Sequence, residues 1–135
     1  MNLTVYTDGG ALNNPGPAAS AYLIYQGKKL LFKEVISIGN ASNNVAEYTA
    51  LIMAFKKIEE MKKTSSVLSI TCLADSKLLV MQVRGLYKIK HPDMRRLYSE
   101  VKVLEMSLGL IPSYKHVPRE QNEEADALVK SVLLP

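Results

Sequence analysis

The spacing of apolar residues changes once along this chain of 135 residues, and that change restricts the possible folds more than any other feature. Up to residue 38 apolar and β-branched residues follow a strand-like pattern, in segments at Leu3–Thr7, Ala19–Gln26 and Leu30–Ile38. From Val45 onward the period is that of an amphipathic helix. We therefore expect three antiparallel strands first, then a helix that packs on them.

The remainder of the chain alternates helix-like and strand-like segments. The first helix is expected to end near Lys62, and the apolar run Val67–Ala74 is typical of a buried central strand. Pro112 interrupts a last strand over 110–117 and places it at a sheet edge. Further helices are expected over 77–84, 92–108 and 120–133. The fold class is therefore α/β, with order β-β-β-α-β-α-α-β-α: a mixed sheet of antiparallel and then parallel strands flanked by helices.

Composition indicates an ordinary globular protein, large enough for one domain. Apolar residues make up 47% and charged residues 22% of the chain. No apolar run approaches the roughly 20 residues that span a bilayer, and no secretory leader is apparent. We expect a cytoplasmic protein with no membrane partner. Cys72 is the only cysteine, so an internal disulfide and a cysteine metal site are excluded, and its apolar neighbours predict a buried thiol.

Charge is unevenly distributed along the sequence. Residues 77–102 hold seven cations against Asp93 and Glu100, whereas residues 119–126 hold Arg119 against four acids. A basic segment suits contact with a polyanion, and an acidic cluster suits a bound cation. Charge runs are also common on solvated surfaces, so this pattern needs support from other motifs. The seven cations are Lys77, Arg84, Lys88, Lys90, Arg95, Arg96 and Lys102.

Four acids stand where the expected elements meet: Asp8 at the end of the first strand, Glu47 in the first turn of a helix, Asp75 after the buried strand and Asp126 near the start of the last helix. Each has an ordinary explanation. Asp8 could belong to a hairpin turn, Glu47 to a capping box begun by Asn44, Asp75 to an N-cap, and Asp126 to a solvated helix face. Together they can converge on one sheet edge, where oxygen ligands suit Mg²⁺ or Mn²⁺ rather than zinc.

Four segments, in order, resemble the type 1 ribonuclease H family. They are Thr7–Gly10 with Asn14–Pro17, then Asn43–Tyr48, Asp75–Ser76 and His116–Asp126. The resemblance covers nearly the whole chain and implies a ribonuclease H-like fold with a five-stranded sheet, forming a single catalytic domain over residues 1–135 with no separate hybrid-binding domain. It also implies a monomeric endonuclease that cuts the RNA strand of an RNA/DNA hybrid and leaves 5′-phosphate and 3′-hydroxyl ends.

The resemblance implies roles for particular residues. Asp8, Glu47, Asp75 and Asp126 would hold two Mg²⁺ (or Mn²⁺) ions, and Glu47 would also contact a ribose 2′-hydroxyl. His116 would assist proton transfer or product release. The expected substrate contacts within the matched segments are Gly9, Gly10, Asn14, Asn43, Asn44 and Ser76, together with Ser42 directly before one of them, and outside them we expect contacts from Lys77, Lys88 and Lys90.

The chain departs from the family pattern in places. Lys77 stands where many members have glutamine, there is no Trp, and a long basic insertion between the second and third helices is missing. In place of that insertion, we expect the hybrid to be bound by Lys88, Lys90, Arg95 and Arg96. Two other functions stay open: a nuclease of this fold that also cuts double-stranded RNA, and a non-catalytic nucleic-acid-binding homologue. The presence of all four acids argues against the second. Without the resemblance, loop and cap chemistry would be the better explanation of the asparagines.

Overall fold

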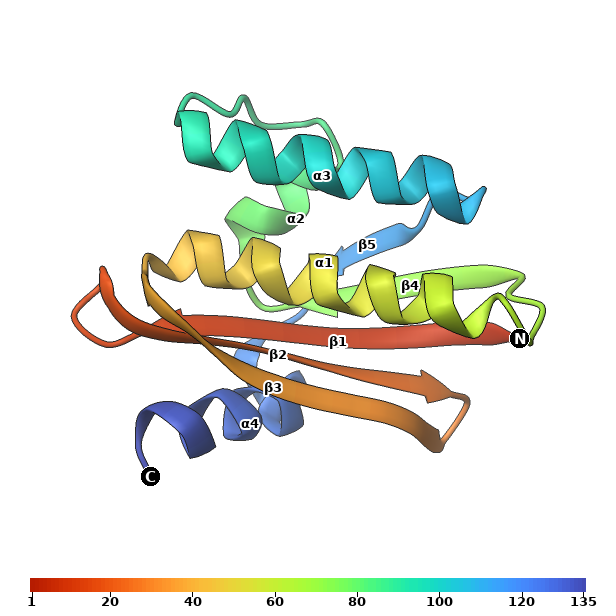
Figure 1. Ribbon diagram of the computed structural model, residues 1–135, viewed down its shortest axis with the longest axis horizontal. Coiled ribbons are helices and arrows are strands. Elements are labelled where there is room, and N and C mark those ends of the chain that lie inside the picture. The colour runs from red at the N-terminus through yellow and green to blue at the C-terminus, as the bar shows by residue number, and fades with distance from the viewer.

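The computed structural model describes residues 1–135 and contains one five-stranded sheet with helices on both faces (Figure 1). The element order predicted from the sequence is confirmed. The strands are β1 (Asn2–Ala11), β2 (Gly16–Gln26), β3 (Lys29–Ala41), β4 (Ser69–Ala74) and β5 (Ser113–His116). The helices are α1 (Asn43–Met61), α2 (Lys77–Val83), α3 (Pro92–Leu108) and α4 (Glu123–Leu133), with a short 3-10 turn η1 (Arg119–Gln121) before α4.

The strands lie in the order β3-β2-β1-β4-β5, which confirms a mixed sheet. The pairs β1–β2 and β2–β3 are antiparallel, whereas β1–β4 and β4–β5 are parallel. Thus β5 lies at an edge, as expected, but it is shorter than the predicted 110–117 and begins at Ser113, after Pro112. The register aligns Thr7 of β1 with Ala74 of β4, and Ala74 with His116 of β5. The three parallel strands therefore reach the same end of the sheet together.

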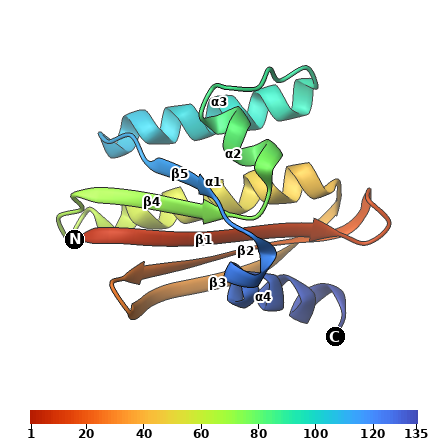
Figure 2. The same ribbon diagram turned by 180° about the vertical axis from the view of Figure 1, so that it is seen from behind.

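Helices α1 and α3 lie on one side of the sheet and α4 lies on the other (Figures 1 and 2). The main core forms where the apolar face of α1, including Leu51 and Phe55, packs on Leu3 and Val5 of β1. A second, smaller core joins α4 to β2 through Ala19, Ala21 and Val129. The apolar face of α3 is buried against this core through Leu97, Val101, Leu104 and Leu108. None of the helices combines the length and apolar character needed to cross a membrane.

The first strand does not end at Asp8, which corrects the prediction. It continues to Ala11 because Gly9 and Gly10 pair with Ser20 and Ala19 of β2. The hairpin turn lies at residues 12–15 instead, so a turn does not explain Asp8. The third strand is also longer than expected and runs to Ala41, leaving Ser42 as the whole connection to α1.

The caps of α1 and α2 differ from those predicted, by one or two residues each. Ser42 is the N-cap of α1 and accepts a hydrogen bond from the Val45 N–H at 3.2 Å, so Asn44 does not begin a capping box. Ser76, rather than Asp75, is the N-cap of α2 and accepts from the Leu79 N–H at 3.2 Å. Glu47 and Asp75 are therefore not explained by helix capping.

Candidate active site

Two acids lie side by side where β1 and β4 separate. The parallel pairing ends at Thr7 and Ala74, and the next residue of each strand is an aspartate, Asp8 and Asp75. Beyond this point β1 continues beside β2, while the chain after β4 turns into α2. The carboxyl ends of parallel strands are a common position for ligand sites, because the diverging chains leave open space there.

Glu47 reaches the same place from α1. Its Oε1 accepts a hydrogen bond from the Gly9 N–H at 3.3 Å, so the α1 backbone lies directly against β1. A Cβ atom on Gly9 would be only 2.3 Å from the Ala46 carbonyl carbon, so no other residue fits. Gly10 instead faces α4, where a Cβ would lie 3.5 Å from Val129. The glycine at position 9 is therefore required by the close approach of α1, and the substrate contact implied for Gly9 stays a prediction.

Asp8, Glu47 and Asp75 form one compact group, called here the carboxylate trio. Each offers an oxygen, and these oxygens lie within 4.8 Å of one another. Asp8 is 6% and Glu47 is 7% exposed. Burial, together with the charge of Asp75, raises the pKa of Asp8 to about 7, while burial and the charge of Asp8 raise the pKa of Glu47 well above its usual value.

The carboxylate trio fits a divalent cation. None of its three acids forms an ion pair with a Lys or Arg of the chain. Glu47 Oε2 is buried and accepts no hydrogen bond from a backbone N–H, an amide, a hydroxyl or a cationic side chain. Buried polar atoms are normally satisfied, so this orphaned oxygen points to a ligand that the chain itself does not supply. Crowded hard oxygen donors of like charge match the preference of Mg²⁺ and Mn²⁺.

Asp126 lies beside the carboxylate trio and not within it. Its Oδ2 is 2.9 Å from Lys130 Nζ, one turn further along α4. Its charge still helps to raise the pKa of Asp8, so the two carboxylates are near each other. The structure thus brings three of the four predicted ligands together and places the fourth nearby, on the helix that covers the other sheet face.

Side-chain hydrogen bonds of Asn14 and Asn43 connect the β1–β2 loop to the start of α1. Asn14 Oδ1 accepts from the Asn43 N–H at 2.8 Å, and Asn43 Oδ1 accepts from the Ala11 N–H at 2.8 Å. The loop and cap chemistry proposed as an alternative therefore occurs at both residues. The Nδ2 amide groups of both residues donate to no protein atom, so they stay available to an incoming acceptor.

The remaining predicted residues lie outside the carboxylate trio, and the roles expected for them stay predictions. His116 is the exposed last residue of β5 and is not part of the carboxylate trio. Lys77 is the exposed first residue of α2, directly after Ser76. Asn44 is exposed in the first turn of α1.

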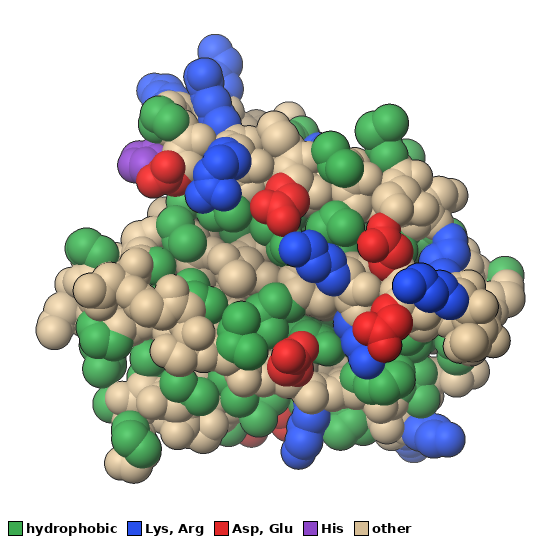
Figure 3. Space-filling model, viewed as in Figure 1, with side chains coloured by type: hydrophobic (Ala, Val, Ile, Leu, Met, Phe, Trp, Pro, Cys, Tyr) green, Lys and Arg blue, Asp and Glu red, His purple; other side chains and the backbone are tan.

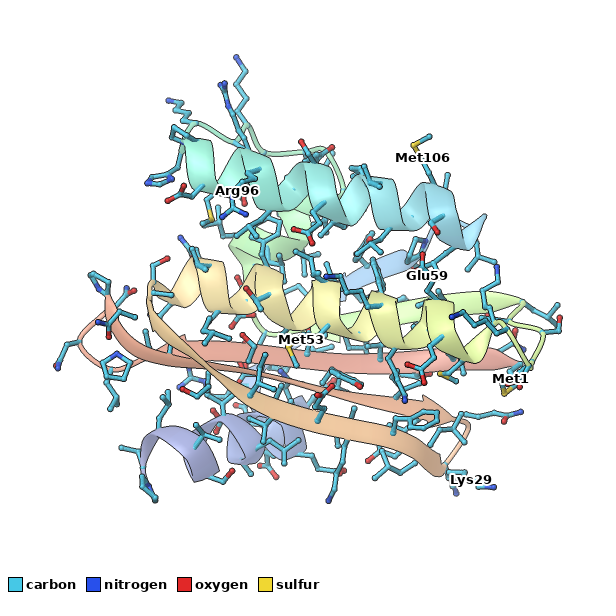
Figure 4. The ribbon with its side chains drawn as sticks, in the orientation of Figure 1. Met1, Lys29, Met53, Glu59, Arg96 and Met106 are labelled. Carbon is cyan, nitrogen blue, oxygen red and sulfur yellow. The ribbon has the colours of Figure 1, made fainter.

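The basic segment is only partly available for substrate. Lys88 and Lys90 are exposed in the loop between α2 and α3, and Lys and Arg side chains gather at the end of the molecule where α3 begins (Figure 3). Arg96 lies on the first half of α3 (Figure 4). Arg95 Nε donates to the Ile89 carbonyl at 2.7 Å and thereby holds the loop. Lys102 is bound internally, to the Val83 carbonyl at 2.6 Å and to Glu105.

Sequence reasoning missed Asn122. This residue is 1% exposed, and its Nδ2 donates to the Thr7 carbonyl oxygen at 2.9 Å, directly before Asp8. The helix expected over 120–133 begins only at Glu123, after a 3-10 turn, so Asn122 lies just ahead of α4. An asparagine at that position normally indicates a cap, and the sequence contains no signal that this side chain turns toward β1 instead.

Known proteins resemble the chain over nearly its whole length. The family described as "Reverse transcriptase-like" matches residues 6–132. The structure of LC11-RNase H1 in complex with an RNA/DNA hybrid has a TM-score of 0.91 and 34% identity, covering 96% of this chain and 94% of that one. RNase H1 from the halophilic archaeon Halobacterium salinarum NRC-1 has a TM-score of 0.88 and 33% identity, covering 98% of both chains. The chain belongs to the type 1 ribonuclease H family.

Relatives of this family member include much longer proteins. "Bifunctional protein Rv2228c" of Mycobacterium tuberculosis is 35% identical over 135 residues, which are 98% of this chain but 36% of that protein. The chain therefore spans about a third of the length of this relative. The family assignment confirms the resemblance drawn from the four segments, and the β3-β2-β1-β4-β5 sheet with its four helices is the fold of the ribonuclease H neighbours.

Proposed function

We propose that this chain is an endonuclease that hydrolyses the RNA strand of RNA/DNA hybrids. The observation that carries the proposal is the carboxylate trio: three acids from β1, α1 and β4 meet in a buried place, with no cation from the chain and one orphaned Glu47 oxygen. A similar protein, LC11-RNase H1, has been solved in complex with an RNA/DNA hybrid, which supports this substrate class.

We infer that Asp8, Glu47 and Asp75 hold divalent cations and that Asp126 completes the set, with two Mg²⁺ or Mn²⁺ ions per site. Divalent cations supply two things to phosphodiester hydrolysis: a more acidic water molecule and neutralisation of charge on the phosphate. The buried carboxylates contribute a fixed arrangement of oxygen donors that needs little reorganisation when the ions bind. All four acids come from this chain, so the proposed site needs only a monomer.

The chain's own residues would bind and orient the hybrid. The free amide groups of Asn14 and Asn43 can donate to phosphate or ribose oxygens, and Glu47 can accept from a 2′-hydroxyl, the group that distinguishes RNA from DNA. A water oxygen would attack phosphorus and the bond to the 3′ oxygen would break. That oxygen takes up a proton, leaving 3′-hydroxyl and 5′-phosphate ends. We place His116, exposed beside the site, in proton transfer or product release.

One gel series tests the proposal. Labelled RNA/DNA hybrid, double-stranded RNA, double-stranded DNA and single-stranded RNA are each incubated with Mg²⁺ and with Mn²⁺. We expect cleavage of the RNA strand of the hybrid, abolished by Asp8→Asn and by Asp75→Asn. Asp93→Asn, at an exposed acid in the first turn of α3, is the matched control and should retain activity. Cleavage of double-stranded RNA at a similar rate would show the broader nuclease, and binding of the hybrid without cleavage would show the non-catalytic homologue.

A further inference from the structure

We propose that Asn122 is a positioning residue that sets where Asp126 stands relative to the carboxylate trio. It would do so by tying the start of α4 to β1 directly beside Asp8. This inference rests on the proposed function, because it takes Asp126 to be a metal ligand.

Asn122 is bonded to the immediate surroundings of two acids at once. Its side-chain Nδ2 donates to the carbonyl oxygen of Thr7, the residue before Asp8, at 2.9 Å. Its backbone carbonyl accepts from the Asp126 N–H at 3.0 Å. A single residue thus connects the strand that carries Asp8 to the helical turn that carries Asp126, across 115 positions of sequence.

Helix capping does not explain this side chain. Asn122 occupies the N-cap position of α4, where an asparagine oxygen usually accepts a hydrogen bond from the first turn, but it makes no such bond. Its Oδ1 is buried and unpartnered. Packing does not explain it either, because an apolar residue could fill the same place without burying an unsatisfied amide oxygen. The bond to Thr7 is the only side-chain hydrogen bond that Asn122 makes.

The position of α4 depends on few polar contacts. After β5 the chain passes the carboxyl end of β4 and crosses the middle of β1 to reach the opposite face (Figure 2). The Val117 N–H, bonded to the Ala74 carbonyl at 2.9 Å, fixes the start of this crossing, and Asn122 fixes its end. Beyond Asn122, α4 rests on a small apolar core and on an exposed hydrogen bond from the Tyr25 hydroxyl to Glu124 at 2.7 Å. The register of Asp126 is therefore set mainly at Asn122.

The test compares Asn122→Ala, Asp126→Asn and the double variant. The first measurement needs no substrate: the midpoint of thermal unfolding is followed as Mn²⁺ is added, which gives an apparent affinity. We expect Asn122→Ala to weaken this affinity by about 10-fold or more, as expected for a residue that orients a metal ligand. Asp126→Asn should weaken affinity and Mg²⁺-dependent hybrid cleavage strongly in the native background but have much less effect in the Asn122→Ala background. Tyr25→Phe, which removes the other hydrogen bond between α4 and the sheet, is the matched control and should leave the affinity unchanged.

The outcomes separate this inference from the proposed function. If Asp126→Asn weakens the Mn²⁺ affinity but Asn122→Ala only lowers the unfolding midpoint, Asn122 is merely structural and the inference is wrong. The inference is also wrong if the double variant loses affinity by the full product of the two single losses. An Asp126→Asn variant with unchanged affinity contradicts the ligand assignment itself. Asn122→Ser keeps a small polar group but is too short to reach Thr7, so it replaces Asn122→Ala if that variant does not fold.

Discussion

The surroundings of Asp8 disfavour the ionised form of its carboxyl group. Burial and the charge of Asp75 raise its pKa from 3.8 to about 7. In the unfolded chain both effects disappear, and the carboxyl ionises at its ordinary value. The metal-free native state therefore binds this proton more tightly than the unfolded state does. The resulting stability is fully present below about pH 4 and is lost as the pH rises through about 7.

Replacing Asp8 should therefore stabilise the metal-free protein at high pH only. We expect Asp8→Asn to increase the free energy of unfolding at pH 8 by an amount on the order of 1–3 kcal/mol, with little change at pH 4. Urea unfolding in the presence of a chelator measures both values, with Asp93→Asn as the control for a surface acid. An equal gain at both pH values, or none at pH 8, would contradict the explanation.

Gly9 and Gly10 should respond very differently to the same substitution. Gly9→Ala places a methyl group 2.3 Å from the α1 backbone, so α1 must move away from β1. We expect a loss of about 3 kcal/mol in the free energy of unfolding, together with weaker metal binding as Glu47 shifts. Gly10→Ala meets only an ordinary contact at 3.5 Å from Val129 and serves as the matched control. Equal stability of the two variants in urea unfolding would argue against close packing at Gly9.

For whole helices and strands, the sequence predicts where an element begins or ends only where a single Pro or Gly marks that position. The helix α3 begins and ends as expected because Pro92 opens it and Gly109, with φ of 73°, closes it. The end of β1 could not be predicted, because Asp8-Gly9-Gly10 is typical of a turn. Whether those residues pair is decided by the partner strand, where small side chains at Ala18 to Ser20 continue the ladder.

The same limit applies to the residues of the site. Ser42 and Asn44, or Asp75 and Ser76, have similar capping tendencies, so sequence alone could not say which residue caps. The convergence of Asp8, Glu47 and Asp75 was predicted by placing each acid at the end of a strand or the start of a helix. This placement is right for Glu47 and Asp75, whereas Asp8 lies within β1, directly after the last residue that pairs with β4. The direction of the Asn122 side chain was not predictable, because it depends on where α4 crosses the sheet.

The two residues before α2 can be tested separately, Ser76 as the N-cap and Asp75 as a proposed metal ligand. We expect Ser76→Ala to reduce the free energy of unfolding by about 1 kcal/mol, the usual effect of losing an N-cap. Asp75→Ala should cause no comparable loss in the metal-free protein, because it removes a repelling charge, yet it should abolish cleavage. Unfolding and cleavage assays on the two adjacent variants measure both effects. A larger loss of stability at Asp75 would mean that the aspartate is the cap after all.

Across the whole molecule, opposite charges are arranged around the proposed substrate path. The carboxylate trio repels a nucleic acid until cations neutralise it, whereas the exposed cations near the start of α3 attract phosphates (Figure 3). Lys102 is bound internally and Arg95 holds the α2–α3 loop, whereas Lys88 and Lys90 of that loop are exposed and form no ion pair, so both are available to the hybrid.

Removing these two lysines should change the salt dependence of binding. We expect Lys88→Ala with Lys90→Ala to reduce the slope of log affinity against log salt concentration by about 1 to 2, because each lost phosphate contact releases fewer counterions. Hybrid binding is measured in an Asp75→Asn background, so that no cleavage interferes. Lys29→Ala, at the far end of the sheet, is the control (Figure 4). Equal slopes for all three proteins would place the phosphate contacts elsewhere.

The hydrogen bond between Asn122 and Thr7 joins residues 115 positions apart, and this affects when the site can appear during synthesis. A chain that has left the ribosome only as far as β5 already contains Asp8, Glu47 and Asp75, but neither Asn122 nor Asp126. Contacts of such large sequence separation also form slowly during folding. The proposed set of four carboxylates would therefore be complete only after α4 has emerged and packed on the sheet.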